Sequence, residues 1–130
     1  YRKDMPLHRL YFHDIATPDK IPGQMKALVQ WVNDADTKRS THIVRLAAKT
    51  HYSLLQTYPF PKHSGKVARL ILNVMLMDVG YPPVIIHATE RQRYYEALKQ
   101  GEDRTAALVS EALVASVEST ISFYERLQEG

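Results

Sequence analysis

The sequence predicts a mainly α-helical domain, a bundle around a buried central helix with a small β-hairpin at its N-terminal end. Apolar residues recur at three- and four-residue steps through most of the chain after residue 20, as on the inner faces of packed helices. Alternation typical of a strand occurs only before that point. The length of 130 residues, 45% of them hydrophobic, favours one core, so residues 1–130 are interpreted as a single domain.

The N-terminal segment, residues 1–20, carries the strand signal. Residues 8–15 are rich in aromatic side chains and partly alternate between polar and apolar, and Pro18-Asp19 is typical of a turn after them. We therefore expect a short hairpin or extended flap here. Its expected contact residues for a protein partner are Leu10, Tyr11 and Phe12.

Five helices are expected in the remaining helical core, residues 21–130, and the first of them should fade through residues 33–36. The five cover about residues 21–33, 40–55, 64–79, 89–99 and 103–128. Pro22 suits the first turn of a helix. Pro59 and Pro61 cannot donate a backbone hydrogen bond, so they end the second helix.

The third predicted helix is expected to be the buried centre of the bundle. Its residues, 64–79, are apolar nearly all round, which is typical of a helix enclosed by others, and Gly80 ends it. The fifth predicted helix instead has one apolar stripe. Four of its side chains are expected to point inward: Leu113, Val117, Ile121 and Tyr124.

The composition excludes several classes of protein. Without cysteine the chain can form neither a disulfide nor a thiolate metal site, which fits the cytoplasmic location that we expect. The formal charge of +3 is too small to indicate nucleic-acid binding. The most apolar stretch, residues 70–79, is far shorter than the roughly 20 residues of a membrane span, so no membrane partner is expected. Because the chain begins at Tyr1, we expect it to be part of a longer protein.

The segment most informative about function joins the second and third predicted helices. Residues 58–69 read Tyr-Pro-Phe-Pro-Lys-His-Ser-Gly-Lys-Val-Ala-Arg. The first amides of a helix have no partners within the helix and lie at the positive end of its dipole, so they favour an anion. Gly65 permits close approach to the backbone, and Lys66 and Arg69 add charge on one helical face. The candidate phosphate-binding residues are Lys62, Ser64, Gly65, Lys66 and Arg69.

A purely structural interpretation of this segment is also open. In it, Ser64 caps the helix, Gly65 is a flexible residue next to the cap, and the lysines are solvated. The segment is not a Walker loop, because no leading glycine with a four-residue spacer precedes its Ser-Gly-Lys and no strand leads into it.

The same segment resembles the signature of the Fic (filamentation-induced-by-cAMP) family, His-Pro-Phe-x-[Asp/Glu]-Gly-Asn-[Gly/Lys]-Arg-x-x-Arg. The resemblance extends over nearly the whole chain, in the family's order. It covers Tyr1-Arg2 with the expected hairpin, then residues 21–33 and 46–52 before the motif, and residues 80–83 and 94–98 after it. The resemblance implies a Fic-type helical bundle whose hairpin is the family's substrate-clamping flap.

Fic domains typically transfer AMP from ATP to a hydroxyl of a protein target, so the resemblance implies an adenylyltransferase-like domain that binds ATP or another nucleotide. It also implies an altered site. Tyr58 stands where the family has the histidine that deprotonates the target, and a phenol keeps its own proton at neutral pH. Lys62 stands where an acidic residue holds magnesium, and an ammonium cannot bind a metal ion. Magnesium is therefore not expected, and AMP transfer (AMPylation) should be weak or absent.

Other motif positions and side chains complete the list of candidates. His63, Ser64 and Lys66 replace the family's glycine, asparagine and first arginine, whereas Phe60, Gly65 and Arg69 match. His63, or His51 seven residues before Tyr58, could supply a substitute base, although each fits a packing role as well. Tyr94 and Tyr95 match positions that help form the base pocket in relatives. No pair of histidines shows metal-ligand spacing, so no metal site is expected.

Three hypotheses remain open from the sequence. The first is a Fic domain with a degenerate motif that binds nucleotide or phosphate but transfers little AMP. The second is an active nucleotidyl- or phosphotransferase that uses His63 or His51 as its base, with Lys62 in place of the metal. The third is a protein-binding scaffold that pairs with a partner strand along the edge of the flap.

Overall fold

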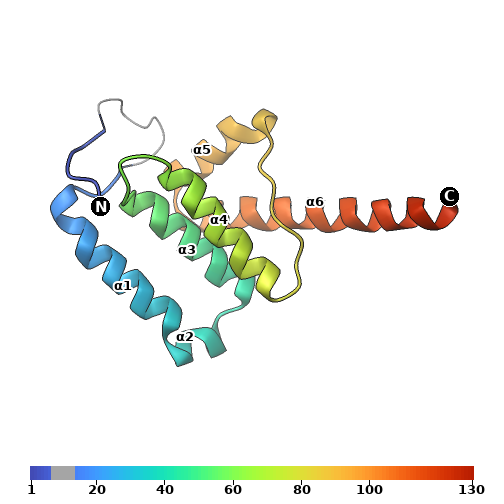
Figure 1. Ribbon diagram of the computed structural model, residues 1–130, viewed down its shortest axis with the longest axis horizontal. Helices are drawn as coiled ribbons and strands as arrows, with labels where there is room; N and C mark the ends of the chain where they lie inside the picture. Colours follow the sequence, from blue (N-terminus) through green and yellow to red (C-terminus); the bar gives the residue numbers. More distant parts are fainter. Residues whose placement is uncertain (7–13) are drawn as a thin grey trace.

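The computed structural model describes residues 1–6 and 14–130, and these residues form a helical domain (Figure 1). Its helices are α1 (Ile21–Asn33), α2 (Ala35–Ser40), α3 (Ile43–Thr57), α4 (Ser64–Asp78), α5 (Arg91–Gln100) and α6 (Glu102–Glu129). Short 3₁₀ turns, Pro18–Lys20 and Ala88–Glu90, lead into α1 and α5. The prediction of a mainly helical domain is confirmed.

The expected N-terminal hairpin is not seen. No strand occurs in residues 1–6 or 14–130, and the first element after the N-terminal segment is the 3₁₀ turn Pro18–Lys20. The proposed contact residues of the flap, Leu10, Tyr11 and Phe12, lie in residues 7–13, outside the described residues.

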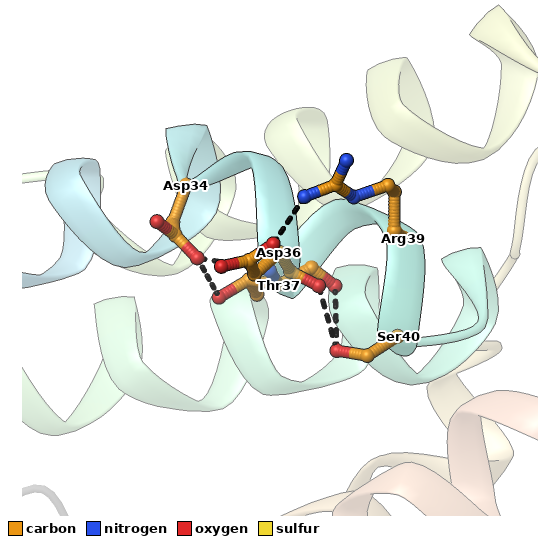
Figure 2. Close-up of polar contacts among 5 residues, drawn as sticks. All are labelled: Asp34, Asp36, Thr37, Arg39 and Ser40. Atoms are coloured by element: carbon orange, nitrogen blue, oxygen red, sulfur yellow. Dashed lines mark hydrogen bonds and ion pairs between the residues drawn. The ribbon is translucent and has the colours of Figure 1, made fainter.

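Helix α2 was not predicted from the sequence, in which residues 33–36 resemble only the fading end of the first helix. Asp34 starts the new helix: its Oδ2 accepts hydrogen bonds from Thr37 N at 2.9 Å and from Thr37 Oγ1 at 3.0 Å (Figure 2). These bonds, the backbone one above all, hold the pKa of Asp34 below its usual range. An exposed ion pair between Asp36 and Arg39 spans the helix, and Ser40 Oγ donates to Asp36 O at 2.7 Å (Figure 2). Asp34 is therefore the N-cap of α2.

The central helix of the domain is α3, so the expectation that the third predicted helix is enclosed was wrong. Side chains of α3 are buried along most of its length, where it packs against α1, α4 and α6 (Figure 1). The adjacent alanines Ala47 and Ala48 allow other helices to approach its axis closely. In α4 one face is buried, whereas Leu70 is 63% and Val74 59% exposed. An apolar helix surface is thus no guarantee of enclosure.

Only the N-terminal half of α6 belongs to the core. Leu113 is buried and Val117 packs beside it, but Ile121 is 51% and Tyr124 61% exposed, so their expected inward orientation was wrong. The helix continues past the other elements, and its C-terminal end lies away from the bundle (Figure 1). By length and composition alone α6 also meets the criterion for a membrane-spanning helix, a criterion that core helices of soluble proteins meet too.

The segment between α4 and α5 is extended and tied to α4 by one side chain. Asn73 Oδ1 accepts from Val84 N at 2.7 Å, and Asn73 Nδ2 donates to Val84 O at 3.2 Å. The side-chain amide of Asn73 thus pairs with both backbone polar groups of Val84, as a neighbouring β-strand would. Val84 is buried in the core against α4. This attachment fixes the path of the chain into α5 and therefore the position of the residues just before that helix.

Candidate functional site

The loop that carries the motif, residues 58–63, is held between two residues in the left-handed conformation. Tyr58 caps the C-terminus of α3 with φ 47°, and His63 precedes α4 with φ 67°. They are the two non-glycine residues with positive φ among the residues that the structure describes. Because such a conformation is costly for a residue with a Cβ, strain of this kind often marks a functional loop.

Arg2 fastens this loop to the N-terminal segment. Its Nε donates to Tyr58 O at 2.6 Å and its Nη2 to Thr57 O at 3.2 Å, while its backbone N donates to Pro59 O at 2.8 Å. The residue is only 4% exposed. These carbonyls lie at the C-terminus of α3, the negative end of the helix dipole, so a buried guanidinium both satisfies and neutralises them.

Ser64 is not the cap of α4, and its part in phosphate binding stays a prediction. It is the first residue of α4, whereas His63 is the N-cap and makes no side-chain capping bond. Ser64 is 2% exposed, and its Oγ accepts from Phe60 N at 3.0 Å and lies 3.2 Å from Phe60 O, to which it donates. Its hydroxyl therefore closes the loop from within. The start of α4 is left without a side-chain cap. Its first backbone amides, like those of any helix, have no hydrogen-bond partner within the helix.

Arg69 lies over the start of α4 and lines a cavity. A methyl group added at Gly65 would lie 3.3 Å from Arg69 Nη1, so the guanidinium is folded back across the glycine. The cavity beside it measures about 120 Å³. Its walls are formed by Arg69, Ile86, His87, Arg91, Tyr94 and Tyr95. Two guanidiniums and an imidazole surround this space, and among the described residues no carboxylate lines it, so its electrostatic potential favours an anion.

The structure thus brings together Gly65, Arg69, Tyr94 and Tyr95, although α4 and α5 are distant in sequence. Of the two tyrosines, Tyr94 is buried, at 3% exposed. Their rings lie 5.6 Å apart between centroids. The other predicted ligands are not part of this group: Lys62, His63 and Lys66 are exposed and do not line the cavity.

A second cavity adjoins the first. It measures about 490 Å³ and is lined by residues of α5 and the turn before it, including Arg91, Tyr95, Lys99 and the carboxylate-bearing Glu96. Arg91 and Tyr95 line both cavities. The smaller one can hold a phosphate group or a few water molecules, but drug-sized ligands occupy about 300–1,000 Å³. A nucleotide would therefore have to extend past Tyr95 into the larger cavity.

Two basic residues of the site, His87 and Arg91, were missed by the sequence analysis. Arg91 lies three residues before Tyr94 and four before Tyr95, so helical spacing alone places it beside them on α5. That signal was present in the sequence. No periodic pattern covers His87, which comes from the extended segment and reaches the cavity only through the tertiary fold.

Beneath the cavity, His51 and Tyr94 form a buried pair. His51 Nε2 lies 2.5 Å from Tyr94 OH, and the two side chains are 0% and 3% exposed. Burial lowers the pKa of His51 to about 4, a shift that the Ala68 backbone partly opposes and the charge of Arg69 increases. Burial raises the pKa of Tyr94 to about 12, opposed by the charge and a hydrogen bond of Arg69. At neutral pH both groups are uncharged. His51 is a poor candidate for a substitute base because an imidazole with a pKa of about 4 binds a proton only weakly and the side chain is fully buried.

The lowered pKa of His51 predicts acid sensitivity. The unfolded chain takes up a proton near pH 6.5 and the folded one only near pH 4, so stability falls as the pH decreases between these values. The loss attributable to this residue should be roughly 3 kcal/mol. Urea unfolding at pH 7 and pH 4.5 measures it, with the non-titrating His51→Gln variant for comparison. Equal pH dependence in both proteins would contradict this assignment.

Comparison with known proteins shows the family to which the chain belongs. A family model described as the Fic/DOC family matches residues 1–76. A protein adenylyltransferase Fic of Nematostella vectensis is 34% identical over 112 residues, covering 86% of this chain and 26% of that protein. One of Drosophila mojavensis is 35% identical over 107 residues, covering 79% and 21%. The chain thus spans about a fifth to a quarter of these relatives.

Solved structures of Fic proteins share the fold. A Fic-domain-containing signalling protein of Bacteroides thetaiotaomicron superposes with a TM-score of 0.75 at 27% identity, over 82% of this chain and 47% of that one. Fic-1 of C. elegans gives a TM-score of 0.72 at 28% identity, over 85% and 36%. Because the family model covers more than half of the sequence and these structures share its helical arrangement, the chain belongs to the Fic/DOC family.

Proposed function

We propose that this Fic domain binds a nucleotide through its phosphates and transfers AMP weakly or not at all. The observation that carries the proposal is the basic cavity of Arg69 and Arg91 next to Tyr94, which shares Arg91 and Tyr95 with a larger cavity. Guanidiniums bind phosphate oxygens with two parallel hydrogen bonds, and an aromatic ring offers a face for a base. The relatives named adenylyltransferases make ATP the first nucleotide to test.

The weak-transfer part of the proposal rests on the motif loop. Tyr58 and Lys62 occupy the positions at which the family signature has its base and its metal-binding carboxylate. The Lys62 side chain is exposed and offers only N–H donors, so it does not suit a magnesium ion. Losing a positioned base typically lowers a rate by about 10²–10⁴-fold. When bound, magnesium would neutralise phosphate charge, and here Arg69 and Arg91 are left to supply that charge.

Calorimetry with ATP tests the binding step. We expect binding in the presence of EDTA, and little gain in affinity when magnesium replaces EDTA, since no carboxylate in the described part of the motif loop can hold the ion. The transfer step is tested by incubation with ATP labelled in its α-phosphate and a cell extract. Magnesium-dependent labelling of a protein by the unmodified domain would overturn the proposal.

Arg69 is the residue on which binding should depend most. In Arg69→Gln the cavity loses one of its two guanidiniums, and we expect ATP affinity to fall at least about tenfold, as for removal of a charge-assisted bidentate contact. Arg45→Gln is the matched control, because Arg45 forms an exposed ion pair with Asp103 at 2.9 Å and lies outside both cavities. Equal loss in the two variants would show that the effect is not local to the cavity.

A further inference from the structure

We propose that the larger cavity selects a guanine nucleotide over an adenine nucleotide through Gln92 and Glu96, an inference that rests on the nucleotide-binding function proposed above. Both residues lie on α5 and line this cavity of about 490 Å³ together with Arg91, Tyr95 and Lys99. The residues described around the small cavity include no amide or carboxylate side chain. The two cavities therefore suit different parts of a ligand, an anionic group in one and the polar edge of a base in the other.

The positions of the side chains around the axis of α5 give this ligand its direction. Each residue of a helix is turned by about 100° from the one before, so Gln92 and Glu96 lie on the far side of Tyr95 from Tyr94. Of the two cavities, Tyr94 lines only the small one, whereas Arg91 and Tyr95 line both. With its phosphates bound at Arg91 and its base against Tyr95, a nucleotide presents the edge of that base to Gln92 and Glu96.

Gln92 and Glu96 form a hydrogen-bonded pair about one helical turn apart. Gln92 Nε2 donates to Glu96 Oε1 at 3.3 Å, and both side chains are exposed. This bond places the amide nitrogen beside the carboxylate, and the nitrogen carries a second N–H for a ligand. The ionised carboxylate only accepts, and each of its two oxygens has more than one lone pair. The pair therefore offers one N–H donor next to two accepting oxygens.

Guanine can make more hydrogen bonds to this pair than adenine can. On its Watson–Crick edge O6 accepts while N1–H and N2–H both donate, so O6 can bind Gln92 Nε2 and the two N–H groups can bind the two oxygens of Glu96. Adenine has one amino donor on this edge and an N1 that only accepts. It therefore makes one hydrogen bond to the carboxylate where guanine makes two. Because hydrogen bonds to an ionised group are stronger than neutral ones, the difference favours guanine.

Calorimetry with three nucleoside triphosphates tests the proposal. In buffer with EDTA, GTP should bind the unmodified domain about tenfold more tightly than ATP, as expected for one additional hydrogen bond to a charged group. Inosine triphosphate keeps O6 and N1–H of guanine but lacks the N2 amino group, so it should bind about as weakly as ATP. The quantity compared is the ratio of the GTP and ATP affinities, because the phosphate contacts at Arg69 and Arg91 are common to both nucleotides and cancel from it.

One pair of variants locates the selection at Glu96. Glu96→Gln should lower the GTP-to-ATP ratio to about twofold or less, because the amide has a single accepting oxygen and cannot bind both N–H groups of guanine equally well. Glu118→Gln is the matched control, since Glu118 is exposed on α6 and lines neither cavity, and it should leave the ratio unchanged. Each substitution removes one exposed carboxylate, so a general effect of charge on phosphate binding alters both affinities but not their ratio.

The outcomes separate base selection from nucleotide binding. If GTP and ATP bind the unmodified domain equally well, the proposed function stands and the inference is overturned. It is also overturned if inosine triphosphate binds as tightly as GTP, or if Glu96→Gln and Glu118→Gln lower the ratio by the same amount. If none of the three nucleotides binds, the proposed function fails and the inference fails with it.

Discussion

The double substitution Tyr58→His and Lys62→Glu is expected to create magnesium-dependent AMP transfer at a rate at least about 100 times that of the unmodified domain. The imidazole restores a base whose proton affinity suits neutral pH, a change worth about 10²–10⁴ in rate. The carboxylate restores an oxygen ligand for the ion between the phosphates. Histidine should also tolerate the backbone at this position better than tyrosine, because φ is 47° there. Self-labelling with ATP labelled in its α-phosphate measures the gain without knowledge of the target.

The two single variants are the controls for this experiment. Lys62→Glu alone should gain magnesium binding but little transfer, and Tyr58→His alone should gain less than the pair, because the base and the metal act on the same step. A double variant that binds ATP and magnesium yet transfers no AMP would show that the replaced pair is not what limits activity. The exposed His63 would then be the next residue to examine, since the family signature has glycine at its position.

The boundaries of the helices could be predicted from the sequence where residues close to each boundary determine it. Pro59 does end α3 within two residues, and α4 begins at Ser64 as expected. Depth in the core could not be predicted in the same way. An apolar stripe shows that a surface could be buried, and Ile121 shows that it need not be, because burial depends on whether another element reaches that turn.

In the candidate site too, single residues could be selected from the sequence, whereas their contacts could not. Helical spacing selected Arg69 and the resemblance to the Fic family selected Tyr94, although nothing local indicated that they would line one cavity. The capping role considered for Ser64 was wrong, because a serine at a helix start usually caps it and here the hydroxyl turns back to Phe60 instead. The partner of a short polar side chain is set by loop geometry, which the sequence pattern does not reveal.

Replacing Arg2 by methionine is expected to lower the free energy of unfolding by about 4 kcal/mol, among the largest effects for one residue of this domain. Methionine fills similar volume but donates nothing, so the carbonyls of Thr57, Tyr58 and Ala16 lose their guanidinium partner where water has little access. The loop that starts at Tyr58 loses its attachment, and any binding at α4 should weaken with it. Urea unfolding and ATP calorimetry on the same samples measure both effects.

Arg2→Lys and Lys3→Met are the control variants for Arg2→Met. An ammonium keeps the charge at the C-terminus of α3 but cannot reach several carbonyls with one planar group, so Arg2→Lys should lose a large part of the same stability. Lys3 is exposed and adjacent in sequence, so Lys3→Met should change stability by less than about 0.5 kcal/mol. If Arg2→Lys were as stable as the unmodified domain, helix-dipole neutralisation would account for the role of Arg2. The fork of hydrogen bonds at 2.6 and 3.2 Å would then be incidental to the stability of the motif loop.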